Sequence, residues 1–111
     1  MGRFIYGTQR TRIEIEDRAL AHLQRVIGNK LRRNERFFFS WKEDVSVGGG
    51  RRTVWVHHGA DLEFAYYGSR TPSMSRDWLE ALNTVANSST GLYLVPEPAP
   101  RSSRTPDPLA A

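Results

Sequence analysis

Three large aromatic side chains, Phe38, Trp55 and Tyr67, are expected on one face of a sheet with basic neighbours. Each ring belongs to one of three strand-like runs between Arg36 and Tyr67, and in each run it alternates with the residues expected to face the core. All three rings are therefore expected on the opposite face. Exposed rings stack on bases and arginine pairs with phosphate, as on the sheets of single-strand-binding modules. The candidate binding residues are Arg36, Phe38, Arg51, Arg52, Trp55, His57 and Tyr67.

The same rings have a second interpretation, in which they are covered. Large aromatic residues on a sheet are often buried against another part of the chain or against a second copy of it. The N-terminal hairpin, the C-terminal tail and a dimer partner are the candidates for this cover. The primary prediction is therefore a non-catalytic module that associates with itself or with a protein partner. Weak binding of nucleic acid or another polyanion is the alternative.

A glycine-rich stretch, Ser46 to Arg52, offers a weaker anion-binding signal. Backbone N–H groups of consecutive glycines can cradle an anion, and two arginines follow. A phosphate-binding loop requires a helix after the glycines and a lysine followed by Ser or Thr, whereas a strand follows here. We interpret the stretch as a flexible hairpin loop.

Catalytic and metal-binding patterns are weak. His57 and His58 are accompanied by Asp61 and Glu63, but adjacent residues of a strand point to opposite faces and cannot hold one ion together. No Gly-x-Ser-x-Gly elbow occurs. We therefore expect no catalytic residue, no metal site and no cofactor.

The candidate face requires a sheet, which the aromatic stretch itself predicts. The segment from Arg36 to Tyr67 holds eight of the chain's twelve aromatic residues, and breaks rich in Gly, Asp and Ser divide it into three strands. We expect a three-stranded antiparallel meander. Its core-facing residues would be Phe37, Phe39, Trp41, Val54, Val56, Leu62, Phe64 and Tyr66.

Two helices and a hairpin are expected around the meander. Runs 3–6 and 11–15 form the hairpin, and Asp17 is the candidate N-cap of a helix with apolar residues at helical spacing. Ser73 or Ser75 caps a second helix, and 92–95 is a last strand. The opposite face of the first helix, predicted to be solvated, carries Arg18, His22, Arg25 and Lys30, and close approach to the sheet is the expected reason for Gly28.

The order ββαβββαβ predicts an α+β domain over residues 1–95, with two helices on one face of a mostly antiparallel sheet. Residues 96–111 contain five prolines with Ser, Arg and Ala and no apolar period, which predicts a disordered tail.

Composition limits the functional classes. The 111 residues include no cysteine, so disulfides and thiolate chemistry are excluded. Fourteen arginines against two lysines and a net charge of +4 are compatible with a polyanion partner, although a GC-rich genome explains the same bias. No apolar run approaches the length of a signal core or membrane span, so we expect a cytoplasmic protein without membrane contact.

Three segments carry a resemblance to a known family: DRALAHLQRVIGNKLRRNE (17–35), FSWKEDVSVGGGRRTVWVH (39–57) and YYGSRTPSMSRDWLEALNTVANSSTGLYLVPEP (66–98). The chain resembles, over nearly all of its length except the tail, short proteins of unknown function from high-GC actinobacteria of the Microbacteriaceae type. Many of these carry the automatic label "ATP-dependent DNA ligase". The resemblance implies a bacterial cytoplasmic origin and, at most, a DNA-linked context.

The label can be compared with the residues. Ligases of that kind attach AMP to the lysine of a Lys-x-Asp-Gly motif, whereas Lys42-Glu43-Asp44 is followed here by Val45. The chain is also too short for both a nucleotidyl-transferring domain and a DNA-clamping one. We do not expect ligase activity.

Overall fold

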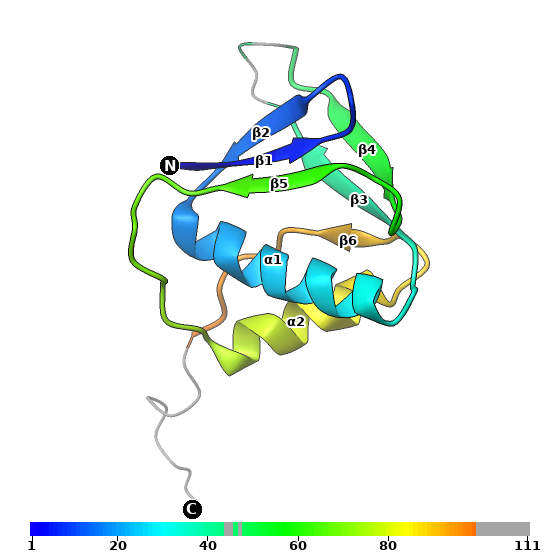
Figure 1. Cartoon of the computed structure of the whole chain (residues 1–111). Coiled ribbons are helices and arrows are strands. Elements are labelled where there is room, and N and C mark those ends of the chain that lie inside the picture. Colours follow the sequence, from blue (N-terminus) through cyan, green and yellow to red (C-terminus); the bar gives the residue numbers. More distant parts are fainter. Residues whose placement is uncertain (44–45, 47, 100–111) are drawn as a thin grey trace, which may run out of the picture.

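The computed structural model describes residues 1–43, 46 and 48–99. It confirms the α+β class and the order ββαβββαβ (Figure 1). The elements are β1 (Gly2–Tyr6), β2 (Thr11–Ile15), α1 (Asp17–Arg32), β3 (Phe37–Lys42), β4 (Arg51–Val56), β5 (Leu62–Ala65), α2 (Arg76–Ala86) and β6 (Leu92–Tyr93).

The strands form two sheets, with the orders β2-β1-β5 and β4-β3-β6. The predicted meander is therefore wrong in its last strand, because β5 pairs with β1 and not with β4. After β4 the chain turns at His57, whose carbonyl accepts from the Ala60 N–H at 3.1 Å. The other side of β3 is taken by β6, which runs parallel to it. Strands that follow one another in sequence usually pair, as β1 with β2 and β3 with β4, but β5 and β6 pair with strands that are distant in sequence.

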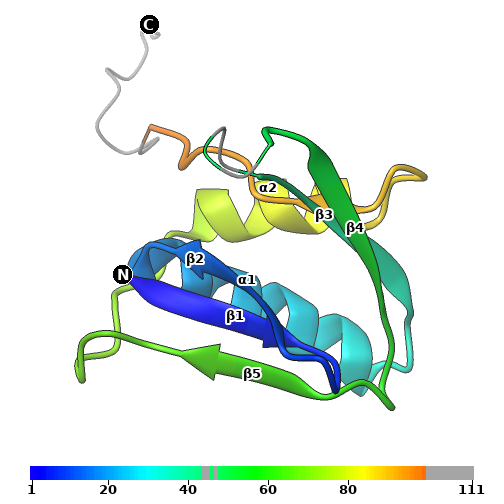
Figure 2. The same ribbon diagram turned by 90° about the horizontal axis from the view of Figure 1, so that it is seen from above.

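One core lies between the two sheets and the helices. The strands of the two sheets run at a steep angle to one another (Figure 2). The edge of the Phe4 ring meets Phe39 of the other sheet with 5.4 Å between centroids. The Tyr6 hydroxyl also donates to the Trp55 carbonyl, which joins β1 to β4. The largest fully buried apolar side chains are Phe4, Phe39, Leu20, Leu23, Ile27, Leu82, Leu92, Val26 and Val56.

Helix α2 begins as predicted, with Ser75 as its N-cap. The Ser75 hydroxyl accepts from the Trp78 N–H at 3.2 Å. Trp78 is buried, and its indole N–H donates to the Val95 carbonyl at 2.8 Å. The start of the helix is thereby fastened to the chain that follows β6.

Helix α1 begins differently from the prediction. Its N-cap is Glu16, which makes no side-chain capping bond, and Asp17 is the first helical residue. The Asp17 carboxylate accepts from the N–H groups of Gly68 at 2.8 Å and Tyr67 at 3.1 Å. These bonds lower the pKa of Asp17, and they tie the chain after β5 to the helix. The residue that local spacing marks as a cap is thus used for a tertiary contact.

Two members of the helix face predicted to be solvated are buried. His22 is 0% exposed, with Nδ1 2.7 Å from the Arg18 carbonyl and Nε2 accepting from the Ser75 N–H at 2.8 Å. Lys30 is 4% exposed, and its ammonium donates to Asn87 Oδ1 at 2.7 Å and Glu35 Oε1 at 2.9 Å. Helix α2 packs on this side of α1, so the polar groups are satisfied inside the protein.

The chain beyond β6 remains in contact with the domain at Glu97. Its carboxylate pairs with the Arg18 guanidinium at 2.7 Å. This pair lowers the pKa of Glu97 and raises the pKa of Arg18. Residues 100–111, which make up most of the segment predicted to be disordered, lie outside the described residues.

Candidate functional site

The outer face of the β4-β3-β6 sheet carries half-exposed aromatic rings. Trp55 lies opposite Phe38 in the antiparallel register of β3 and β4. Their ring centroids are 4.8 Å apart, with the planes inclined at 62°. Trp55 is 45% and Phe38 47% exposed, so each ring supports the other while keeping surface open to solvent.

Strict alternation along the strands produces this face. Phe37, Phe39 and Val56 point inward and are at most 5% exposed. Their neighbours Phe38 and Trp55 must therefore point outward, because successive side chains of a strand lie on opposite faces. The core fixes which residues meet solvent.

A third ring joins this face from β6. Tyr93 lies beside Ser40 in the parallel register and is 47% exposed. The Ser40 hydroxyl lies 2.8 Å from that of Thr53 on the other side. Tyr93 is not among the candidates predicted from the sequence, because nothing local says that β6 pairs with β3. Its alternation with the buried Leu92 was the only available signal.

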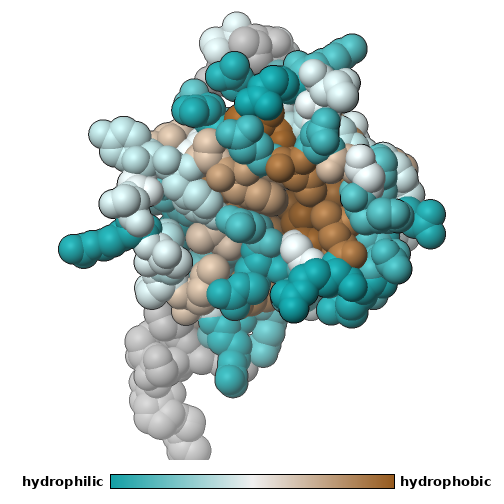
Figure 3. Space-filling view, in the orientation of Figure 1, coloured by the Kyte–Doolittle hydropathy of each residue, from teal (hydrophilic) through white to brown (hydrophobic). Residues whose placement is uncertain are grey.

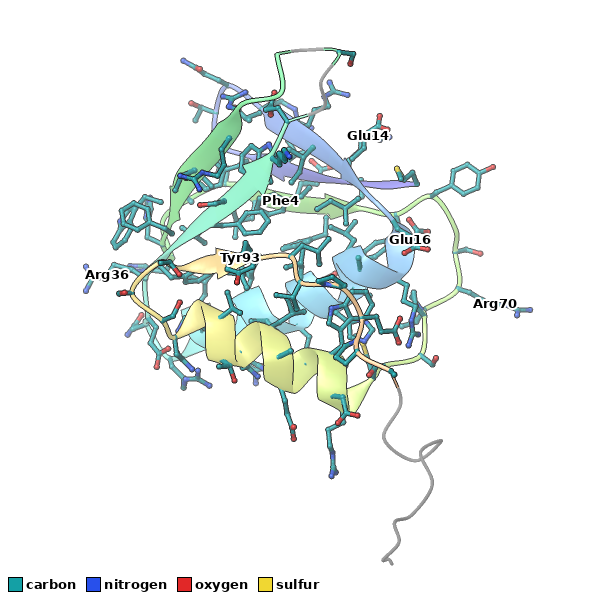
Figure 4. All side chains as sticks on the ribbon, turned by 180° about the vertical axis from the view of Figure 1, so that it is seen from behind. Phe4, Glu14, Glu16, Arg36, Arg70 and Tyr93 are labelled. Atoms are coloured by element: carbon teal, nitrogen blue, oxygen red, sulfur yellow. The ribbon has the colours of Figure 1, made fainter. Side chains whose placement is uncertain are left out.

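The charge of the face is positive. Arg36, Lys42 and Arg51 are exposed at or beside its outer positions, and Lys42 lies opposite Arg51. Like charges at such a pair repel, and a bound anion would relieve the repulsion. Within the described parts of β3, β4 and β6, no carboxylate occupies an outward position. Figure 4 shows Arg36 and Tyr93 beside β3 and β6, with Glu14 and Glu16 on the opposite side of the view.

An open depression of about 430 Å³ adjoins the two paired rings. One wall comes from the α2–β6 connection, which supplies the hydroxyls of Ser88 and Ser89. The depression is also lined by the carboxylate of Glu35. This carboxylate accepts hydrogen bonds from Arg33 and Lys30, which lower the pKa of Glu35 to about 2. The depression therefore offers aromatic, hydroxyl and amide groups beside Arg36.

The connection stays close to β3 because of Gly91. Its φ is +86°, and a Cβ there would lie 2.7 Å from the Phe38 carbonyl oxygen. Only glycine fits both the backbone conformation and the close approach. Gly28, by contrast, has no atom within 4 Å of the place that a Cβ would occupy, so the expected close approach of that glycine to the sheet is wrong.

Four of the seven predicted binding residues, Arg36, Phe38, Arg51 and Trp55, come together on the face. Tyr67 is 85% exposed but follows β5 in the other sheet, beyond the end of β5 remote from β4. Arg52 points the other way and lies over the Trp41 ring at 5.9 Å. His57 is half-buried in the turn after β4, where Nδ1 accepts from the Gly59 N–H at 3.2 Å.

The described residues also bear on metal ligands, membrane-spanning helices and the glycine-rich stretch. Among residues 1–43, 46 and 48–99, no group of three metal-ligating side chains is present. In the same residues, no helix is long and apolar enough to cross a membrane. The two arginines after the glycines, Arg51 and Arg52, are the first residues of β4. Asp44, Val45 and Val47 lie outside the described residues.

The chain matches a known protein family over most of its length. A family described as "Domain of unknown function (DUF7882)" matches residues 1–97. No curated protein and no solved structure matches the chain.

Proposed function

We propose that this chain, which belongs to the family "Domain of unknown function (DUF7882)", binds single-stranded nucleic acid on the outer face of its β4-β3-β6 sheet. The observation that carries the proposal is a face with three half-exposed rings, Phe38, Trp55 and Tyr93, and no outward carboxylate in its described strands. Rings and cations together match a ligand that has both flat bases and phosphates.

Each group on the face has a role in this proposal. The rings of Trp55, Phe38 and Tyr93 stack on successive bases, which requires no particular base. Arg36, Lys42 and Arg51 pair with phosphates along the strand. The hydroxyls of Ser40 and Thr53 lie between the rings and can donate to sugar or base oxygens. Binding of this kind is tolerant of sequence and sensitive to salt.

The same face is less suited to self-association, the primary prediction from the sequence. A two-fold dimer through Phe38 and Trp55 would bring two copies of the same positively charged face together. Such like-charge contacts cost free energy at an interface. A nucleic acid removes this cost, since its phosphates neutralise the same cations.

A ligase role, which is named only in the automatic label of the resembling proteins, would require adenylation of Lys42. Lys42 is exposed at the end of β3 beside Arg51, and Val45 replaces the motif glycine. Incubation with radiolabelled ATP and Mg²⁺, followed by denaturing electrophoresis, tests this role. We expect no label on the chain, and label that disappears in Lys42→Met would establish adenylation.

The direct test of the proposal is a titration of fluorescein-labelled oligothymidine at several salt concentrations, read by anisotropy. Three cations on a single strand predict a slope of about −2 for log K against log salt. A duplex of the same length should bind more weakly because its bases are not free to stack. Inorganic polyphosphate, which has no bases, is the control for charge alone.

The outcome is decided by two comparisons. Salt-dependent binding of oligothymidine in preference to polyphosphate supports the proposal. Salt-independent binding, equal binding of polyphosphate, or no binding overturns it. Sedimentation of the free protein as a dimer that dissociates in Trp55→Arg would instead assign the face to a second copy.

A further inference from the structure

One edge of the other sheet has backbone groups with no strand partner among the described residues. Strand β5 is the edge of β2-β1-β5 and pairs on one side only, with β1. The Gly7 N–H donates to the Asp61 carbonyl at 2.9 Å, which continues the register and makes Ile5–Glu63 and Arg3–Ala65 the hydrogen-bonded pairs. The N–H and C=O groups of Leu62 and Phe64 therefore point away from β1.

A groove lies along this edge, between β5 and α1. It has a volume of about 570 Å³ and an apolar floor that includes Leu62, Phe64 and Leu31. Figure 3 shows apolar surface between β5 and α1, surrounded by hydrophilic side chains. Gly28 lines the groove with open space above it, so the helix leaves room at this point. Tyr66 bounds the groove, and its hydroxyl donates to Gln24 Oε1 at 2.5 Å.

The charge around the groove has one sign. Arg25, Arg32 and Arg70 line it and are exposed, and no lining residue is acidic. An acidic ligand is therefore complementary to the rim, and an apolar one to the floor. The segment 100–111 of this chain has Arg101 and Arg104 against a single Asp107, so its charge does not suit the groove. A second copy would bring the same arginines to the contact.

We propose that the edge of β5 takes an extended segment of a partner protein, with alternating acidic and apolar residues, as an added strand. The backbone groups of Leu62 and Phe64 supply the pairing that any extended peptide can use. Apolar side chains on one side of that peptide cover the floor between β5 and α1. The acidic side chains on the other side of the peptide face solvent, where the positive charge of the exposed Arg25 and Arg70 attracts them. This site is separate from the sheet face proposed for nucleic acid and does not depend on it.

The experiment uses the full chain labelled with ¹⁵N and a peptide of about eight residues with alternating valine and glutamate, a usual strand length. We expect the amide signals of Leu62, Phe64 and α1 residues beside Gly28 to shift as peptide is added. A peptide methylated on alternate backbone nitrogens keeps the side chains but cannot pair with the edge. A peptide with lysine in place of glutamate tests the charge.

Charge reversal provides the matched variants. In Arg25→Glu/Arg70→Glu, two positive charges of the rim are reversed, so affinity for the glutamate peptide should fall about tenfold. Arg12→Glu, an exposed reversal on the opposite edge strand β2, should leave the affinity unchanged. Circular dichroism confirms that each variant is folded. The double variant should bind the lysine peptide better than the wild type does.

Several results would overturn the inference. One is the absence of shifts at about 1 mM peptide, which means a dissociation constant weaker than about 1 mM. The others are shifts confined to other surfaces and equal binding of the methylated peptide. Shifts of the Phe64 amide that depend on protein concentration without peptide would assign the edge to a second copy. Oligothymidine binding is measured separately, so failure here leaves the nucleic-acid proposal standing, and the reverse also holds.

Discussion

The rings of Phe38 and Trp55 meet across two strands with 4.8 Å between their centroids, yet nearly half of each residue stays exposed. A cross-strand aromatic pair stabilises a sheet by about 0.2–1 kcal/mol relative to alanines. The pair therefore has a structural role as well as the proposed role in stacking. Mutations must separate these two roles, which is possible because binding and unfolding are measured independently.

Replacement of Trp55 by alanine should weaken oligothymidine binding by about 1–3 kcal/mol, because one base loses its stacking partner. Tyr67→Ala is the matched control. It also removes a large exposed ring, but Tyr67 follows β5 in the other sheet, so its loss should not change binding. Anisotropy titrations at constant salt measure both. Equal effects of the two substitutions would contradict the placement of the site.

Replacement of Lys30 by methionine should destabilise the protein by about 1–3 kcal/mol, since the hydrogen bonds of the charged ammonium to Asn87 and Glu35 are lost while the apolar stem is kept. The chain's other lysine provides the control. Lys42 is exposed on β3, and Lys42→Met should change the free energy of unfolding by less than about 0.5 kcal/mol. Urea denaturation followed by circular dichroism compares them. A neutral Lys30→Met would show that the α1–α2 contact is not held by this ammonium.

The two glycines Gly91 and Gly28 should respond to alanine in opposite directions. Gly91→Ala places a Cβ against the Phe38 carbonyl at a positive φ, which costs at least about 1–2 kcal/mol. Gly28→Ala lies inside α1 with open space around it and should stabilise by about 0.5–1 kcal/mol. Thermal unfolding gives the order Gly28→Ala, wild type, Gly91→Ala. A tolerated alanine at position 91 would mean that β6 does not approach β3 as closely as described.

Stability should fall in acid because paired carboxylates take up protons on unfolding. The pKa of Glu35 is lowered from 4.5 to about 2, chiefly by Arg33 and then by Lys30. A lowered pKa in the folded state means that the unfolded chain binds protons first, so this contribution is complete above about pH 5 and is lost toward pH 2. Asp17 and Glu97 act in the same direction.

The corresponding measurement is the urea midpoint between pH 5 and pH 2. Glu35→Gln should flatten the dependence, because the substituted amide cannot be protonated in this range. Glu14→Gln, on the exposed side of β2, controls for loss of a surface carboxylate. An unchanged slope in Glu35→Gln would show that the Glu35 pairs do not persist in solution.

Much of the local structure was predictable from residue spacing. Apolar residues at helical intervals predicted α1 and α2, and Ser75 was among the predicted caps. Alternation also predicted which sides of β3 and β4 face the core, so Phe38 and Trp55 were assigned correctly to the outer face. Each of these features depends on residues a few positions apart, whose relative directions are set by backbone geometry.

The composition of the site was predictable only in part. Tyr93 was not predicted on the face of Phe38 and Trp55, and Tyr67 was expected there although β5 belongs to the other sheet, because strand pairing decides which rings become neighbours. In the same way, the spacing of α1 predicted Lys30 on the solvated face of the helix. Lys30 is buried because α2 packs on that face.

The sequence by itself determined the helices, the strands and the sides of β3 and β4 that face the core. Tertiary structure alone decided that β5 pairs with β1, that β6 pairs with β3, and that His22 and Lys30 of α1 are buried. The physical reason is that periodicity follows from the rise and turn of the backbone, whereas partners far apart in sequence are chosen by the packing free energy of the whole core.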